Sequence, residues 1–154
     1  MSSVREIQLA IEAIKTLNKP YLIGAHISEG VRLPSGEKIS DIIHKINHQN
    51  LLGLMLSCVS PENFEQNLDE IKNLGIPFGF KLNGFVTTKP KDGYTNTFNK
   101  SKSGNPNEFL GSREYLTPAK MSEFVKTFKE AGATILGGCC ETRPTHIMEM
   151  AKLK

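Results

Sequence analysis

Residues 51–82 read LLGLMLSCVSPENFEQNLDEIKNLGIPFGFKL, and this stretch indicates the fold class. It opens with a short apolar run, Leu51 to Leu56, which is typical of a buried strand. Ser60 then fits the N-cap of a helix that the apolar spacing extends to the stop at Gly75. A second apolar run, Ile76 to Leu82, follows at once. The pattern predicts two parallel strands joined by a right-handed crossover helix.

The same alternation continues toward both ends of the chain. The predicted strands cover residues 21–27, 51–56, 76–82 and 133–136, and the predicted helices cover residues 4–17, 39–47, 61–74, 118–131 and 144–151. Apolar strands that alternate with amphipathic helices predict an α/β fold, in which helices pack on a parallel sheet. We expect a single domain over residues 1–154. Within it, residues 83–116 form a polar stretch far longer than the ~2 to 6 residues usual between a strand and a helix.

Composition narrows the classes of function. The chain has 154 residues, of which 38% are hydrophobic and 23% charged, as in a soluble globular protein. Its net charge of +3 is scattered along the chain, which argues against nucleic acid as a partner. No apolar run approaches the ~20 residues needed to cross a membrane. We therefore expect a cytoplasmic protein without a membrane partner.

Three cysteines are the residues best suited to chemistry. Cys58 follows the second predicted strand, and Cys139 and Cys140 follow the fourth. Ligands collect at the C-terminal ends of parallel strands, so the three thiols are expected to converge there. Three thiolates suit zinc, and three protein ligands with one open position are typical of a catalytic site. The alternative for Cys58 alone is a small apolar core residue, whereas two adjacent cysteines cannot both fill one core position.

Other polar residues at the same edge are weaker candidates. His26 ends the first predicted strand, where it is expected either to contact substrate or to be a structural histidine. Asn83 follows the third strand, where it is expected either to bind a substrate carboxylate or to cap the loop. His146 is a poor fourth metal ligand, because the helix that begins at Pro144 should direct its side chain away.

The sequence around the cysteine pair resembles a known family. Residues 137–147 read GGCCETRPTHI, which is similar to the signature of the zinc-dependent homocysteine S-methyltransferases. Further similarity lies at Leu33-Pro34-Ser35-Gly36, at Ser57-Cys58 and at Lys81-Leu82-Asn83-Gly84-Phe85. The resemblance implies a (β/α)8 barrel, a TIM-type fold, with zinc held by Cys58, Cys139 and Cys140. Members of the family are about twice as long as this chain, so the resemblance implies half of such a barrel, corresponding to strands five to eight.

The resemblance also implies an activity and a set of partners. The expected reaction is zinc-dependent methyl transfer to homocysteine, forming methionine, or to another small thiol. We expect the reaction only with a complementary N-terminal half-barrel or after pairing of the chain with itself as a homodimer. The alternatives are a non-catalytic zinc-binding fragment, a regulatory or truncated paralogue, and a damaged gene product without a stable fold.

Overall fold

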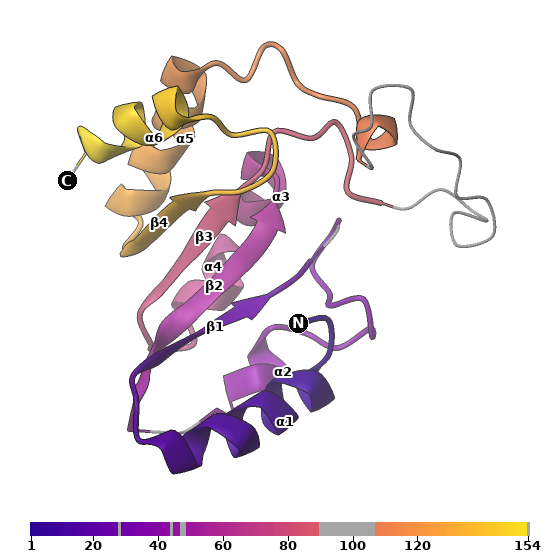
Figure 1. Ribbon diagram of the computed structural model, residues 1–154, viewed down its shortest axis with the longest axis vertical. Helices are drawn as coiled ribbons and strands as arrows, with labels where there is room; N and C mark the ends of the chain where they lie inside the picture. The colour runs from indigo at the N-terminus through magenta and orange to yellow at the C-terminus, as the bar shows by residue number, and fades with distance from the viewer. Residues whose placement is uncertain (28, 44, 47–48, 90–106, 154) are drawn as a thin grey trace.

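The computed structural model describes residues 1–27, 29–43, 45–46, 49–89 and 107–153. Four strands form one sheet in the order β1-β2-β3-β4, and every neighbouring pair is parallel (Figure 1). The strands are β1 (Tyr21–Ala25), β2 (Leu51–Val59), β3 (Phe78–Leu82) and β4 (Ile135–Gly138). The predicted parallel α/β sheet is confirmed.

The helices are α1 (Val4–Ile14), the 3-10 turn η1 (Lys15–Leu17), α2 (Ser40–Ile43), α3 (Pro61–Gln66), α4 (Leu68–Lys72), the 3-10 turn η2 (Glu108–Leu110), α5 (Pro118–Glu130) and α6 (Pro144–Ala151). Figure 1 shows α1 and α2 beside β1, and α5 and α6 beside β4. Three helices begin at a hydroxyl N-cap, because Ser3, Ser60 and Thr117 each accept a hydrogen bond from a backbone N–H three residues on. None of the helices in the described ranges is long and apolar enough to cross a membrane.

Two predicted helices are shorter than expected. The helix predicted over residues 39–47 is confined to α2, and residues 44, 47 and 48 lie outside the described ranges. The helix predicted over residues 61–74 is interrupted at Asn67, which lies between α3 and α4. The buried Asn67 amide donates to the carbonyls of Asn63 and Gly30. Its bond to Asn63 competes with the helix ladder, which explains the interruption.

Two predicted strands end later than expected. β2 continues to Val59, so Cys58 lies within the strand and not beyond it. β4 covers Ile135–Gly138 and not residues 133–136, because Gly137 and Gly138 pair with Lys81 and Leu82 of β3. Of the predicted loop over residues 83–116, residues 90–106 lie outside the described ranges. Its described ends are joined by an antiparallel bridge between Phe85 and Ser112.

The core lies between the sheet and its helices. Phe64 of α3, Phe80 of β3 and Phe128 of α5 are fully buried, with ring centroids 4.8 to 5.6 Å apart. Such tilted and edge-to-face aromatic contacts add to the hydrophobic stabilisation of the core. They attach α3 and α5 to the middle of the sheet.

The opposite face of the sheet is much less covered. Its side chains alternate with the core residues, and along the strands they are Leu22, Met55, Ser57, Lys81 and Ile135. Leu22 is 41% exposed, and the other four are half-buried. At the β1 edge, the Met1 ammonium donates to the Gly24 carbonyl at 3.0 Å, and the His26 N–H donates to the Met1 carbonyl at 2.8 Å. Met1 therefore covers only the last part of that edge.

A glycine allows β3 and β4 to approach each other. A Cβ atom at Gly79 would lie 1.8 Å from the Ile135 carbonyl oxygen. We expect Gly79→Ala to lower the free energy of unfolding by about 3 kcal/mol, because the strands must separate to admit the methyl group. Gly137→Ala is the matched control, since its Cβ would meet its nearest neighbour at an ordinary 3.5 Å. Urea unfolding of both variants measures the difference, and equal stability of the two would contradict the steric argument.

Candidate metal centre

The ends of β2 and β4 bring the three cysteines together. Their Sγ atoms all lie within 4.8 Å of one another. Cys140 Sγ is 3.7 Å from Cys58 Sγ and 3.9 Å from Cys139 Sγ. All three residues are half-buried. The convergence expected from their positions after parallel strands is therefore present in the structure.

Cys58 has an unusual backbone. The pairing of β2 with β3 shifts between Ser57 and Val59, which leaves Cys58 as the extra residue of a bulge. Its φ is +56°, in the left-handed region that non-glycine residues rarely adopt. Such a conformation costs roughly 1 to 3 kcal/mol and is found mostly at functional sites. The bulge breaks the alternation of the strand and re-aims the Cys58 side chain toward Cys140.

Asn83 supports Cys58 from the neighbouring strand. Its side chain is fully buried, and its Nδ2 donates to the Cys58 carbonyl at 2.6 Å and lies 3.8 Å from Cys58 Sγ. Its Oδ1 accepts from the Phe85 N–H at 3.1 Å. The bond from Phe85 is the loop cap that the sequence offered as one alternative for Asn83. The bond to Cys58 holds the bulge in place, a role that the sequence did not indicate. The substrate contact suggested for Asn83 stays a prediction.

A turn after β4 fixes the other two cysteines. The Cys139 N–H donates to the Leu82 carbonyl at 2.7 Å, and the Cys140 carbonyl accepts from the Gly84 N–H at 3.0 Å. Thr142 donates to the Cys139 carbonyl through both its backbone N–H and its hydroxyl. Glu141, directly after the pair, has a φ of +60°. Both cysteines are therefore positioned by backbone hydrogen bonds before any ligand arrives.

The three thiols have different proton affinities. The neighbouring Cys58 thiol favours the Cys139 thiolate and lowers the pKa of Cys139 to about 5. The pKa of Cys58 is raised, first because the nearby Cys139 sulfur favours its protonated form, and then because Cys58 is desolvated and lies beside two further sulfurs. Burial is the main reason that the pKa of Cys140 is raised. One thiol of the cluster thus loses its proton readily. A bound cation would favour deprotonation of the other two thiols as well.

The spacing of the sulfur atoms matches what zinc requires. Tetrahedral zinc with bonds to sulfur of ~2.3 Å holds its sulfur ligands about 3.8 Å apart. The two separations that involve Cys140, 3.7 and 3.9 Å, lie on either side of this value, and the third pair lies within 4.8 Å. Three thiolates occupy three corners of the tetrahedron and leave the fourth for another ligand. The donor set and its geometry therefore fit the metal.

The two histidines considered from the sequence have other partners. His146 is buried; its Nδ1 accepts from the Arg143 N–H at 3.0 Å, and its Nε2 lies 3.1 Å from the Leu116 carbonyl. Both ring nitrogens are therefore engaged away from the cysteines, as predicted. His26 is half-buried, with Nδ1 3.1 Å from the carbonyl of Ser57, the residue before Cys58. It lies beside the cluster, and its contact with substrate stays a prediction.

We expect Asn83→Ala to weaken metal binding without unfolding the chain. Removal of a group that orients a metal ligand typically costs roughly 10- to 100-fold in affinity, because the ligand then moves freely. Competition with a chromophoric chelator measures the change. Asn73→Ala is the matched control, because Asn73 is exposed at the end of α4, away from the cysteines. Equal affinities for Asn83→Ala and the parent chain would show that the amide has no part in holding Cys58.

Comparisons with known proteins agree with the fold and with the family that the sequence resembles. A family model described as homocysteine S-methyltransferase matches residues 1–153. Homocysteine S-methyltransferase 1 of Saccharomyces cerevisiae is 30% identical over 142 residues, which cover 88% of this chain and 39% of the relative. Homocysteine S-methyltransferase 1 of Brassica oleracea var. italica is 23% identical over 150 residues, which cover 96% of this chain and 42% of the relative.

A solved structure shows the same fold. The oxidized form of the homocysteine methyltransferase MmuM from Escherichia coli matches with a TM-score of 0.73 at 17% identity, over 100% of this chain and 43% of that one. The chain thus spans less than half the length of each of these relatives. The predicted fold, half of a (β/α)8 barrel, agrees with four parallel strands that match 43% of the solved enzyme. The match over residues 1–153 shows that this chain belongs to the homocysteine S-methyltransferase family.

Proposed function

We propose that this chain is the zinc-binding half of a homocysteine S-methyltransferase. Cys58, Cys139 and Cys140 would hold the zinc, and the completed enzyme would transfer a methyl group to homocysteine to form methionine. The observation that carries the proposal is the sulfur spacing of 3.7 and 3.9 Å in a chain of this family. Three reduced cysteines need a reducing compartment, so we propose that the protein acts in the cytoplasm.

The residues of this chain would act mainly by preorganisation. Asn83 holds the Cys58 bulge, and Thr142 holds the Cys139 carbonyl, so the three sulfurs are in place before the substrate binds. Zinc, when bound, supplies a Lewis acid that lowers the pKa of a substrate thiol and leaves it nucleophilic at neutral pH. Three protein ligands leave one coordination position for that thiol. The remaining requirement is alignment of the sulfur with the methyl group of the donor.

We further propose that His26 contacts the bound substrate. It follows β1 at the same edge as the cysteines, and its ring lies against the Ser57 carbonyl. The Asn83 side-chain nitrogen donates to the Cys58 carbonyl, and its side-chain oxygen accepts from the Phe85 N–H. This supports a positioning role for Asn83 more strongly than direct contact with substrate.

The proposal includes a complementary half-barrel. The face of the sheet opposite the helices carries half-buried and exposed side chains, including Leu22 and Met55. In a closed barrel, this face packs against the remaining strands. The completing half would also supply the rest of the substrate pocket, because tight substrate binding needs more than the metal.

Transfer of a labelled methyl group tests the proposal. The zinc-loaded chain is incubated with homocysteine and an isotopically labelled sulfonium, ammonium or corrinoid donor, alone and with a complementary N-terminal half-barrel. We expect labelled methionine only when both halves are present and the cysteines are intact. Full turnover by the isolated chain would contradict the need for completion. Zinc binding without transfer to homocysteine in any combination would favour a non-catalytic zinc-binding protein.

A further inference from the structure

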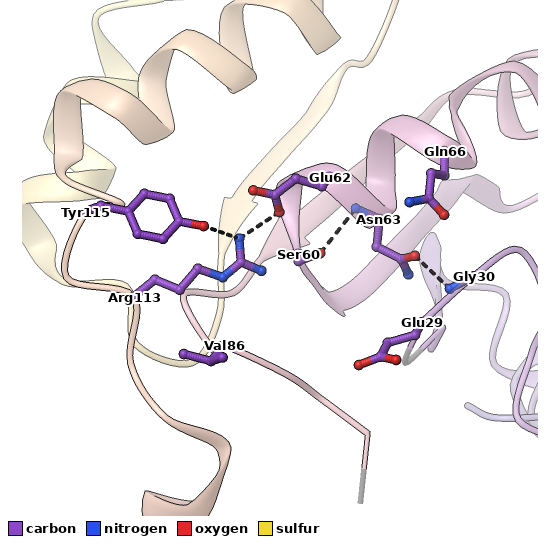
Figure 2. Close-up of a pocket in the computed structure, with 9 residues that line it drawn as sticks. All are labelled: Glu29, Gly30, Ser60, Glu62, Asn63, Gln66, Val86, Arg113 and Tyr115. Carbon is purple, nitrogen blue, oxygen red and sulfur yellow. Dashed lines mark hydrogen bonds and ion pairs between the residues drawn. The ribbon is translucent and has the colours of Figure 1, made fainter.

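Arg113 is a nearly buried cation close to the support of the cysteines. Its side chain is only 9% exposed, and Nη1 donates to the Glu62 carboxylate at 2.6 Å and to the Tyr115 hydroxyl at 3.3 Å. Figure 2 shows the guanidinium group of Arg113 between these two partners, at the wall of a cavity. Burying a charge costs free energy unless the group is paired and hydrogen-bonded. The contacts of Arg113 therefore indicate what it is placed to hold.

Arg113 holds two consecutive carbonyl groups just after β3. Its backbone N–H donates to the Gly84 carbonyl at 2.9 Å, and its Nε donates to the Phe85 carbonyl at 2.6 Å. The first bond does not depend on the side chain at position 113, whereas the second needs a donor at this point. Because Nη1 is bound to Glu62, the planar guanidinium group is held in the orientation that reaches Phe85. The side chain thus fixes the Phe85 peptide group.

The N–H groups of the same two residues hold the support of the cysteines. The Gly84 N–H donates to the Cys140 carbonyl at 3.0 Å, and the Phe85 N–H donates to Asn83 Oδ1 at 3.1 Å. The amide nitrogen of Asn83 in turn donates to the Cys58 carbonyl at 2.6 Å. The two residues therefore link the arginine to two of the three cysteines.

Glu62 completes the network from the other side of the bulge. Helix α3 begins two residues after β2 ends, so Glu62 lies only four residues after Cys58. Glu62 is in the first turn of α3, where the helix dipole favours a carboxylate. Its ion pair with Arg113 joins the start of this helix to the segment that follows β3. The contacts form a closed ring, whose members are Cys58, Asn83, Phe85, Arg113 and Glu62.

We propose that Arg113 is a positioning residue for the metal centre, which it reaches through Phe85 and Asn83. The cysteines at the end of this path are the proposed zinc ligands, so this role rests on the proposed function. Cys58 has a φ of +56°, and such a backbone persists only where its surroundings hold it. A guanidinium group suits this task, because its fixed fork of donors binds a carbonyl and a carboxylate at once.

A double-mutant cycle on zinc affinity tests the path, with affinity measured by competition with a chromophoric chelator. Arg113→Met keeps a long side chain without donors, and we expect it to weaken zinc binding by about tenfold, as for loss of an orienting group. In an Asn83→Ala background, the same substitution should change the affinity by less than about twofold, because Arg113 acts through Asn83. Arg5→Met is the matched control, since Arg5 is exposed on α1.

A milder variant guards against loss of folding, which thermal melting detects. Glu62→Gln keeps an acceptor for Arg113 and removes the charge, so it should weaken zinc binding by a smaller factor. Glu65→Gln, on the exposed side of α3, should leave the affinity unchanged. Unchanged affinity in folded Arg113→Met overturns the proposal, as does unchanged affinity in Glu62→Gln if Arg113→Met does not fold. A further tenfold loss in the Asn83→Ala background also overturns it, because the two residues would then act independently.

Amide hydrogen exchange in the metal-free chain separates this role from the zinc site itself. Arg113→Met should accelerate exchange of the Phe85 N–H by at least about tenfold, because the peptide group that it anchors is released. Exchange of the Leu54 N–H, which donates to the Pro77 carbonyl at 2.9 Å within the sheet, should stay unchanged. If the parent chain binds no zinc, the proposed function fails, and selective acceleration at Phe85 still supports the hold of Arg113 on this segment. Unchanged exchange at Phe85 overturns the proposal whether or not zinc binds.

Discussion

Replacing Cys139 by serine should remove zinc from the purified chain, which we expect to hold one zinc ion per molecule. A serine hydroxyl does not become the anionic, polarisable ligand that a thiolate is, and two thiolates do not close a zinc site. The loss of affinity should exceed the roughly 10- to 100-fold expected from removing a supporting contact such as Asn83. Loss of any one of the three cysteines should have a larger effect on metal binding than any other single substitution in this chain.

The measurement is metal analysis after free ions have been removed under reducing conditions. Thr145→Ser is a suitable control, because Thr145 is exposed on α6 a few residues from the cysteine pair. It should retain one zinc per chain. Absence of zinc from the reduced parent chain, or unchanged zinc content in Cys139→Ser, would refute the assignment of the three cysteines as ligands.

The sequence could predict where the cysteines gather because that depends on topology alone. Apolar runs alternating with amphipathic helices imply parallel strands, and Cys58 and the pair Cys139 and Cys140 follow two of those runs. Parallel strands then place all three at one edge of the sheet. No knowledge of side-chain contacts is needed for this step.

The sequence could not predict what shapes the site in detail. The bulge at Cys58 depends on the exact register between β2 and β3, and nothing in the run LLGLMLSCV marks it. The role of Asn83 depends on the same register, because its amide reaches Cys58 only across neighbouring strands. Arg113 and Glu62 are far apart along the chain, so their ion pair is a product of tertiary packing. A single sequence carries no signal for such pairs.

The metal centre also depends on the middle of the sheet. Cys58 lies in β2 and the other two cysteines follow β4, while β3 lies between these strands and pairs with both. A Cβ at Gly79 would clash with the Ile135 carbonyl oxygen, so we expect Gly79→Ala to move β4 away from β3 and to separate Cys139 from Cys58. We therefore regard the close approach at Gly79 as a condition for the sulfur spacing and not only for stability.

We also expect the chain to associate with itself in solution. Strand β4 is the last strand of the described sheet, so no strand of that sheet pairs with its outer edge. At the other edge, Met1 covers only the end of β1. Unpaired strand edges and an incompletely covered sheet face favour a partner, and two-fold pairing is the commonest arrangement of identical chains. Sedimentation at micromolar concentration should therefore report a species near twice 17.1 kDa, or a heterodimer when a complementary half-barrel is supplied.

A charge on the open face should prevent this association. Leu22→Lys places an ammonium group where Leu22 is 41% exposed on that face, and we expect the dimer to weaken by at least about tenfold. Leu9→Lys is the matched control, because Leu9 is similarly exposed but lies on α1, away from the sheet face. It should leave the dimer intact. A monomeric parent chain that unfolds cooperatively and binds no apolar dye would contradict the half-barrel argument, since the open face would then need no partner in solution.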